Sequence, residues 1–259
     1  MSTYFEYKHK ILSSAFQYTR KQTVDEREIH TYHEILYYID GEATILCESF
    51  SKKLTPNSII LIPKGCYHFL KCEKPESFER LKISFTHIEG FEKIAESTMR
   101  SIRVLEKPDS DILALLKSVC KRLKRSDGEN QSAFLFGALM ILLSSLDENS
   151  KHTPNDTRDT LITATIEYIE ANLSSPLNTD TVAEAMKVST STLSHTFKRE
   201  IGIPLHKYVT QKRMILAKRL IDGDCQPTKI YADCGFGDYS SFYKAFVSYF
   251  GHSPSSKKS

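Results

Sequence analysis

The feature that most constrains this chain is a pair of similar stretches near its C-terminal end, residues 179–202 and 230–251. In each stretch, a short apolar segment and a turn precede a longer segment whose apolar residues recur at every fourth position. The recurring residues are Leu193, Phe197 and Ile201 in the first stretch and Phe242, Phe246 and Phe250 in the second. This spacing places three side chains on one stripe of an α-helix. The sequence therefore predicts two helix-turn-helix units.

Turn and cap residues support both units. Ser189 precedes the long helix of the first unit, and Asp238 precedes that of the second. Serine and aspartate are favoured N-caps because their side-chain oxygens accept hydrogen bonds from free backbone N–H groups. Lys187 falls in the first turn, and Gly235 falls in the second, where glycine adopts a tight turn most easily. Gly202 stands where glycine commonly ends a helix.

Residues 205–221 predict a helix that joins the two units. Pro204 precedes this segment, and Gly223 and Pro227 follow it. A helix of about 18 residues is about 27 Å long, close to the roughly 34 Å repeat of the major groove. Two units joined rigidly by such a helix would therefore lie about one DNA turn apart.

The exposed faces of the two long helices carry side chains that suit DNA. Short hydroxyls, an imidazole and lysines can meet base edges and phosphates. We expect base contacts from Ser191, Ser194 and His195, a phosphate contact from Lys198, and contacts of the second helix from Tyr239, Ser240, Tyr243 and Lys244. A plain helical bundle with serine-rich surfaces is the simpler alternative. Two helix pairs with similar turn and cap residues favour DNA binding instead.

Residues 160–259 resemble the AraC/XylS family of bacterial transcription regulators. The resemblance rests on Ser189, Leu193, Ser194, Phe197, Lys198, Gly202, Pro204, Tyr208, Arg213, Ala217, Ala232, Gly235, Phe236, Phe242, Phe246, Phe250, Gly251 and Pro254. Two departures are Thr179, where leucine is usual, and residues 255–259, which lack the family's common aromatic–arginine ending. The resemblance implies a transcriptional activator that binds double-stranded DNA and works with RNA polymerase. It also implies control by a small-molecule effector such as a sugar.

Charge and cysteine content fit a cytoplasmic DNA-binding protein. The formal net charge of the 259-residue chain is +3, and the excess lies within residues 160–259. The N-terminus does not resemble a signal peptide, and no apolar run approaches the length of a membrane span. The six cysteines form no C-x-x-C pair, so we expect no structural zinc site and no cofactor. A redox role for Cys66 and Cys72 is an alternative to inert thiols.

The N-terminal half has the pattern of a β-rich domain. Short apolar runs separated by turn residues predict strands at 35–39, 43–47, 50–54, 58–62, 69–72 and 78–85. Asp40-Gly41 is a strong hairpin signal. Many short strands with frequent turns predict a sandwich or barrel. We therefore expect an α+β chain with a cupin-like β-barrel domain at 1–146, a polar linker at 147–159 and an AraC-type DNA-binding domain at 160–259.

Part of this half resembles a cupin barrel. Six residues separate Glu34 from Gly41, as in the first cupin motif, and Pro63, Gly65 and His68 fit the second. Asn57 takes the place of a motif glycine and can also adopt a left-handed backbone.

The residues of the first motif leave a metal site and an effector site open as alternatives. His30 and His33 are separated by two residues, and Glu34 follows His33 directly. Alternation along a strand would send His33 and Glu34 to opposite faces, so the motif is broken and no metal is expected. We instead expect His30, Glu34, Tyr37 and His68 to line a pocket for a polar effector. A metal-dependent cupin enzyme with a helical appendage remains the alternative function; the main prediction is a regulator without enzymatic activity.

Two apolar helices are predicted after the strands, at 109–124 and 133–146. The second is apolar nearly all round, which indicates cover on two sides, by the barrel and by a second subunit. We therefore expect a homodimer formed through these helices. They could instead merely close the barrel, and the barrel could serve dimerisation alone.

Overall fold

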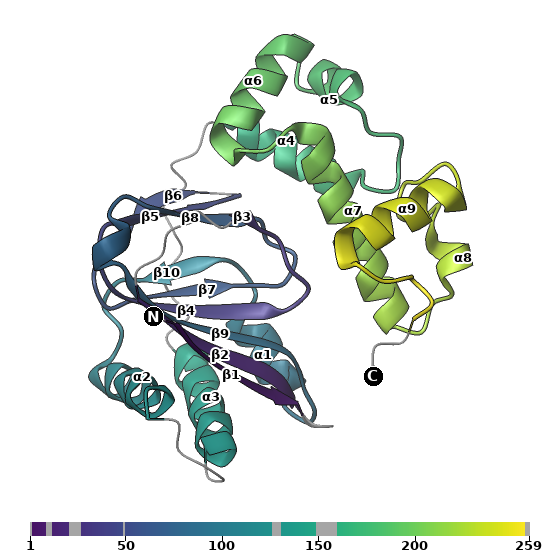
Figure 1. Cartoon of the computed structure of the whole chain (residues 1–259). Helices are drawn as coiled ribbons and strands as arrows, with labels where there is room; N and C mark the ends of the chain where they lie inside the picture. Colours follow the sequence, from purple (N-terminus) through teal and green to yellow (C-terminus); the bar gives the residue numbers. More distant parts are fainter. Residues whose placement is uncertain are drawn as a thin grey trace. The chain divides into compact units, whose positions relative to one another are not determined.

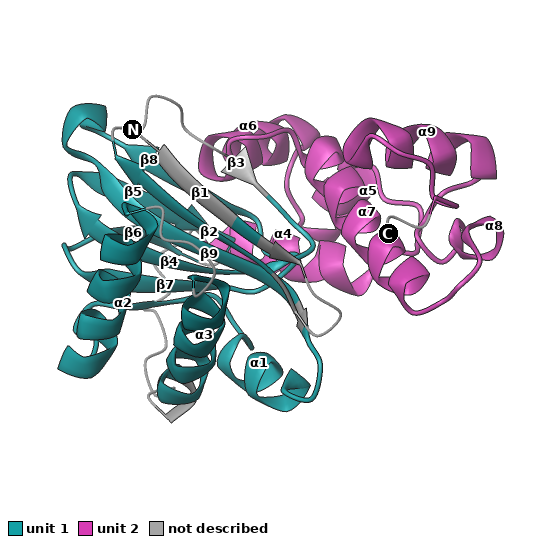
Figure 2. Ribbon diagram, turned by 60° about the horizontal axis from the view of Figure 1, so that its bottom comes forward, with its two compact units in different colours: residues 1–156 teal, residues 157–259 magenta. Residues whose placement is uncertain are grey.

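The computed structural model of the chain describes residues 2–8, 12–20, 27–48, 50–125, 131–148 and 160–256. The chain divides into two compact units, residues 1–156 and 157–259, which are coloured separately in Figure 2. None of the helices within the described ranges combines the length and apolar character needed to cross a membrane. The predicted α+β class, with a β-rich N-terminal part and a helical C-terminal part, is confirmed.

The first unit contains two antiparallel sheets. The larger sheet has the strand order β1-β2-β9-β4-β7-β10, and the smaller sheet has the order β3-β8-β5-β6. The strands are β1 Ser2–Lys8, β2 Leu12–Arg20, β3 Arg27–Glu28, β4 His33–Asp40, β5 Ala43–Cys47, β6 Ser51–Lys53, β7 Ser58–Ile62, β8 His68–Cys72, β9 Glu79–Ile88 and β10 Arg103–Leu105. The smaller sheet faces the larger one (Figure 1). A barrel was predicted. Among the described residues, strand pairing gives two facing sheets and not one continuous ring.

Strand β4 lies between two hydrophobic cores. Leu36 and Tyr38 pack between the sheets, together with Ile45 of β5. The alternate residues Ile35 and Tyr37 pack on the opposite face, in the core beneath the helices. Because both faces of the strand are covered, residues 33–38 are all buried. This explains why the strand is almost continuously apolar instead of alternating with polar residues.

Three helices cover the outer face of the larger sheet (Figure 1). They are α1 Glu92–Thr98, α2 Ser110–Leu123 and α3 Gln131–Glu148. Helix α2 begins after Asp109, whose side chain accepts from the Asp111 backbone N–H at 2.8 Å. The helices predicted at 109–124 and 133–146 therefore form. The predicted linker 147–159 begins within the last turn of α3, and its residues 149–159 lie outside the described residues.

The central strands of the first unit were predictable, and the outer elements were not. Predicted strands 43–47 and 58–62 match β5 and β7, and Asn57 has the expected left-handed backbone with φ of 67°. No prediction was made for strands β1, β2, β3 and β10, for the 3₁₀ turn Pro75–Ser77 or for helix α1. Polar and charged residues interrupt these segments, so their apolar periodicity is weak.

The second unit is helical. Its elements are α4 Thr160–Ala171, α5 Thr179–Ala185, α6 Thr190–Ile201, α7 Leu205–Asp222, α8 Pro227–Ile230 and α9 Tyr239–Phe250. Helices α5 and α6 form the first helix-turn-helix unit, and α8 and α9 form the second. The joining helix α7 has 18 residues and follows Pro204 as predicted.

The turns of the two units share one backbone pattern. Lys187 has φ of 56° and Gly235 has φ of 75°. In the first turn the N–H groups of Lys187 and Val188 donate back to the carbonyls of Glu184 and Ala183, and Gly235 and Phe236 donate in the same pattern to Ala232 and Tyr231. Such paired bonds around a left-handed residue close the end of a helix. The first helix of the second helix-turn-helix unit therefore continues past α8 as turns up to Cys234. The chain then reverses direction.

Candidate nucleic-acid interface and effector cavity

Helix α6 presents three of its four predicted contact residues as exposed side chains. Ser191, His195 and Lys198 are exposed, and Ser194 is half-buried. The core stripe of this helix consists of Leu193, Phe197 and Ile201, which are all buried. The Ser189 side chain accepts from the Thr192 backbone N–H at 3.1 Å and so caps the helix as predicted. Gly202 ends it with φ of 84°.

Helix α9 presents its predicted contact residues less uniformly. Ser240, Tyr243 and Lys244 are exposed, whereas Tyr239 is half-buried against the aromatic rings of Tyr231 and Phe242. Asp238 caps the helix, because its carboxylate accepts from the Ser241 backbone N–H at 2.7 Å. This backbone bond, with the bond from the Ser241 hydroxyl, lowers the pKa of the Asp238 carboxyl.

The two long helices present their contact residues at equivalent positions. Each begins after a capping side chain and ends at a left-handed glycine, Gly202 or Gly251. Ser191 corresponds to Ser240, Ser194 to Tyr243, and His195 to Lys244 when the residues are counted from the caps. The structure therefore supplies two similar helix faces with different side chains, which could meet two different base sequences.

An arginine holds the second helix-turn-helix unit to the rest of the helical unit. From α7, Arg213 donates through Nε to the Leu173 carbonyl at 3.0 Å and through Nη2 to the Ser175 carbonyl at 2.7 Å. The guanidinium also lies 5.7 Å from the centre of the Phe236 ring. These contacts join α7 to the segment after α4 and to the turn before α9. The joining helix, the segment after α4 and the second turn thus pack together.

In the first unit, three of the four predicted effector residues form a buried cluster. Nε2 of His30 lies 3.4 Å from Oε2 of Glu34, and Nε2 of His68 lies 4.0 Å from Oε1 of Glu34. The exposed fractions of His30, Glu34 and His68 are 7%, 1% and 4%. Lys82 approaches Glu34 with Nζ at 3.8 Å.

The charge of this cluster follows from its neighbours. Burial alone would raise the pKa of the Glu34 carboxyl, but His30, His68 and Lys82 outweigh it and lower that pKa to about 2. Burial lowers the pKa of the His68 imidazole to about 4, although Glu34 acts in the opposite direction. At neutral pH the cluster therefore holds an ionised carboxylate and a neutral His68 ring.

Tyr37 does not join this cluster, which corrects the predicted grouping of four. Along β4, Glu34 shares its face with Leu36 and Tyr38, so the odd-numbered Tyr37 lies on the opposite face among the helices. Its hydroxyl donates to Oδ1 of Asn57 at 2.7 Å. His33 was expected to face away from Glu34, and its Nδ1 indeed accepts from the Lys64 backbone N–H at 3.3 Å.

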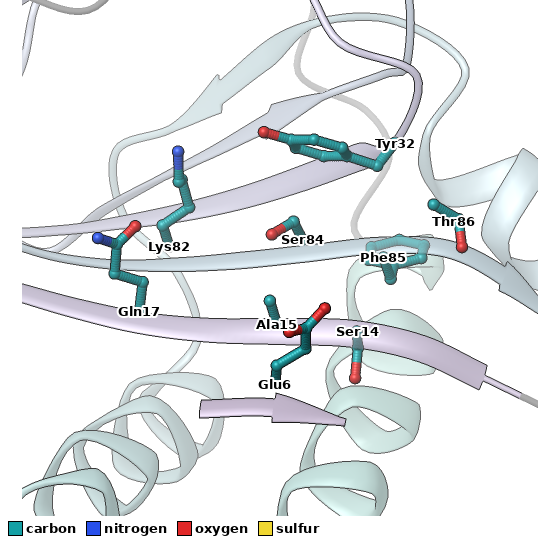
Figure 3. A pocket seen from close by; sticks show the side chains of 9 residues that line it. All are labelled: Glu6, Ser14, Ala15, Gln17, Tyr32, Lys82, Ser84, Phe85 and Thr86. Carbon is teal, nitrogen blue, oxygen red and sulfur yellow. The ribbon is translucent and has the colours of Figure 1, made fainter. Parts of the chain in front are cut away.

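A cavity of about 330 Å³ lies beside the cluster, and Figure 3 shows the side chains that line it. Its lining residues come from β1, β2, β9 and the segment before β4, and they are Glu6, Ser14, Ala15, Gln17, Tyr32, Lys82, Ser84, Phe85 and Thr86. Two of them contact the cluster: the Tyr32 ring stacks on His30 with ring centres 3.9 Å apart, and Lys82 approaches Glu34. Most of the lining is polar, as suits a ligand rich in oxygen atoms.

The sequence-based prediction missed this lining. None of the four predicted effector residues is among the residues that line the cavity. Strand β2 carried a usable signal, because Phe16 and Tyr18 are buried while the intervening Gln17 faces the cavity. That alternation predicts a half-buried strand whose other face is polar.

The sequence matches two family models. One describes an AraC-like ligand binding domain and matches residues 13–143. The other describes a helix-turn-helix domain and matches residues 182–258.

The chain is also similar to curated proteins and to solved structures. The chain is 28% identical over 152 residues to the HTH-type transcriptional activator RhaS of Escherichia coli (strain K12 / DH10B), covering 55% of this chain and 53% of that protein. RhaS of Shigella boydii matches to the same extent. The chain thus spans about half the length of the curated relatives it matches. Among solved structures, ToxT of Vibrio cholerae is 13% identical with a TM-score of 0.41, covering 95% of this chain and 97% of that one.

Proposed function

The chain belongs to the AraC family, and on that basis we propose that it is a sequence-specific DNA-binding transcription regulator, an activator, controlled by a small-molecule effector. The observation that carries the proposal is the pair of helix-turn-helix units held in one helical body, on the same chain as an AraC-like ligand binding domain. The curated relatives named as transcriptional activators support the direction of regulation.

The exposed faces of α6 and α9 are the proposed DNA contacts. Ser191, Ser194 and His195 would contact base edges from α6, and Lys198 would contact a phosphate. From α9, Ser240, Tyr243 and Lys244 would contact DNA, and the half-buried Tyr239 would do so only through its exposed edge. Hydroxyl, imidazole and ammonium groups supply the donors and acceptors that base edges and phosphates require.

The cavity beside β2 and β9 is the proposed effector site. Its volume of about 330 Å³ suits a small molecule. The Lys82 ammonium, the Gln17 amide and the Ser84 hydroxyl can bind hydroxyl or carboxylate oxygens, so a carbohydrate is one fitting class of effector. Occupation of the cavity would shift the balance between conformations that differ in promoter binding.

A homodimer formed through α2 and α3 is part of the proposal. Helix α3 exposes an apolar face on which Ile141 is 57% exposed. Gly137 lies on the same face, and a side chain added there would meet nothing within 4 Å. An exposed apolar helix face is the feature expected of a subunit contact. Such a dimer would present two DNA-binding bodies to a promoter and to RNA polymerase in the cytoplasm.

The proposed division of labour gives residues 1–146 to effector binding and dimerisation, 147–159 to a linker, and 160–259 to DNA binding. The experiment that tests the main proposal is selection of genomic fragments by the purified full chain at fixed, near-physiological salt. We expect enrichment of sites with two contacted boxes about one helical turn apart. A second selection with cell extract added would supply an obligatory effector. Weak, salt-sensitive binding without enrichment in both selections would contradict the proposal, because it is the signature of non-specific phosphate contacts.

A further inference from the structure

The buried cluster of His30, Glu34 and His68 brings three metal-ligating side chains to one point. One nitrogen of each ring and one carboxylate oxygen all lie within 4.8 Å of one another. The three residues come from the segment before β4, from β4 itself and from β8. The register of these strands, rather than a short sequence motif, therefore assembles the cluster.

The hydrogen bonds of the two rings fix which ring nitrogen faces Glu34. Nδ1 of His30 lies 2.7 Å from the Tyr32 carbonyl oxygen, and Nδ1 of His68 lies 3.3 Å from the Cys66 carbonyl oxygen. A carbonyl oxygen only accepts, so each Nδ1 donates, and the other ring nitrogen, Nε2, is the atom directed toward Glu34. Metal-binding histidines are held by this same bond from the second ring nitrogen to a backbone carbonyl.

Three potential metal-ligand atoms therefore converge at a buried point. Nε2 of His30 and Oε2 of Glu34 are buried and make no hydrogen bond within the described residues. At 3.8 Å, Lys82 Nζ is too far from Glu34 Oε2 for a hydrogen bond. Buried lone pairs that face one another are unfavourable unless a cation lies between them.

We propose that His30, Glu34 and His68 bind a divalent first-row transition metal ion. Two imidazole nitrogens and one carboxylate oxygen suit Zn²⁺, Fe²⁺ and Ni²⁺, whereas Mg²⁺ prefers oxygen ligands alone. Ligand bonds of about 2.1 Å place tetrahedral ligand atoms about 3.4 Å apart. His30 Nε2 already lies 3.4 Å from Oε2 of Glu34, and His68 Nε2 lies 4.0 Å from Oε1, the other oxygen of the same carboxylate, so a small rotation of the Glu34 and His68 side chains would bring the three ligands together.

A metal at this point would lie beside the cavity. Tyr32 and Lys82 line the cavity and contact His30 and Glu34 respectively. An effect of the metal on effector binding would rest on the proposed function. Metal binding itself does not.

The test is metal content of the full chain after removal of metal with a chelator and dialysis against Zn²⁺, Ni²⁺ or Mg²⁺. We expect one Zn²⁺ or Ni²⁺ per chain and no Mg²⁺, with a rise in melting temperature on metal addition. Glu34→Gln and His68→Gln should lose the bound ion and the thermal shift. His33→Gln is the matched control, since His33 is also buried next to Glu34 but binds the Lys64 backbone, and it should keep both.

A measurement on the unaltered protein guards against variants that do not fold. X-ray absorption at the zinc edge should show nitrogen and oxygen ligands with imidazole scattering and no sulfur. Absence of bound metal in the unaltered chain, sulfur ligation by cysteine, or equal metal content in Glu34→Gln would each overturn the proposal. None of these readouts involves DNA or an effector, so a failure here is distinct from a failure of the proposed regulatory function.

Discussion

At the scale of single residues, Gly235 is the position in the second turn that tolerates least change. A Cβ atom built there would lie 2.2 Å from the Leu173 carbonyl oxygen and 2.7 Å from the Arg213 guanidinium. The positive φ of 75° adds backbone strain for any other residue. We expect Gly235→Ala to destabilise the helical unit by about 2 kcal/mol or more and to weaken operator binding. Hydrogen exchange of the α8 and α9 amides would measure the loss.

Gly237 provides the matched control for this substitution. It lies in the same turn, but a Cβ atom there would meet nothing within 4 Å, and its φ is not positive. Gly237→Ala should therefore leave amide protection near that of the unaltered protein. Equal effects of the two substitutions would show that the Leu173–Arg213 contact does not constrain the turn.

His195 tests the proposed base contacts at the same scale. Its side chain is exposed on α6. We expect His195→Ala to relax specificity at one position of one box and to cost about 1–3 kcal/mol of binding free energy. Lys198→Ala should instead weaken all sequences alike and reduce the salt slope by about 1. Unchanged sequence preference in His195→Ala, measured by selection from a randomised operator, would remove His195 from the contacts.

At the scale of elements, features that depend on nearby residues could be predicted from the sequence, and features that depend on distant residues could not. The caps Ser189 and Asp238 and the turn at Gly235 were predictable because each depends on neighbours within a few residues. The approach of His68 to Glu34 depends on how strands of two different sheets face each other. Periodicity specifies which face a side chain occupies, but it does not specify strand pairing across the unit.

The difference between local and long-range interactions also explains why only three of the four predicted effector residues lie together. Local alternation correctly separated His33 from Glu34, and it would also have removed Tyr37 from the group had it been applied there. The cavity lining could not be predicted in full because Glu6, Gln17 and Lys82 belong to three different strands. Strand β2 offers only the short alternation at residues 16–18, and polar residues interrupt β1, so neither strand contains an apolar run long enough to be recognised.

A substitution on helix α3 tests the proposed dimer contact. If its exposed face forms the proposed dimer contact, Ile141→Glu would bury a charge against apolar atoms of the second subunit. We expect the dimer dissociation constant to rise by about tenfold or more. Sedimentation equilibrium would measure it, with Lys93→Glu as a control at an exposed position of α1. A dimer that tolerates Ile141→Glu would mean that another surface joins the subunits or that α3 serves only to cover the sheet.

At the scale of the whole molecule, we expect the helical unit to bind DNA as one rigid body with a fixed spacing between its two recognition helices. Helix α7 has 18 residues, and Arg213 fixes it to the segment after α4 and to the second turn. Helix α6 packs on the same helix through the rings of Phe197 and Tyr208. If these contacts persist on DNA, the protein sets the separation of the two boxes in an operator.

Changing the operator spacing tests this rigidity. Insertion of about half a helical turn, roughly 5 base pairs, between the boxes would place the second box on the opposite side of the duplex. We expect affinity to fall to that of an operator in which one box has been replaced, because α6 and α9 could no longer bind together. The same insertion outside the boxes should have no effect in a fluorescence anisotropy titration at constant salt. Equal affinity for both insertions would mean that only one helix-turn-helix unit contacts DNA, and α9 would then serve to support α7 instead of to bind bases.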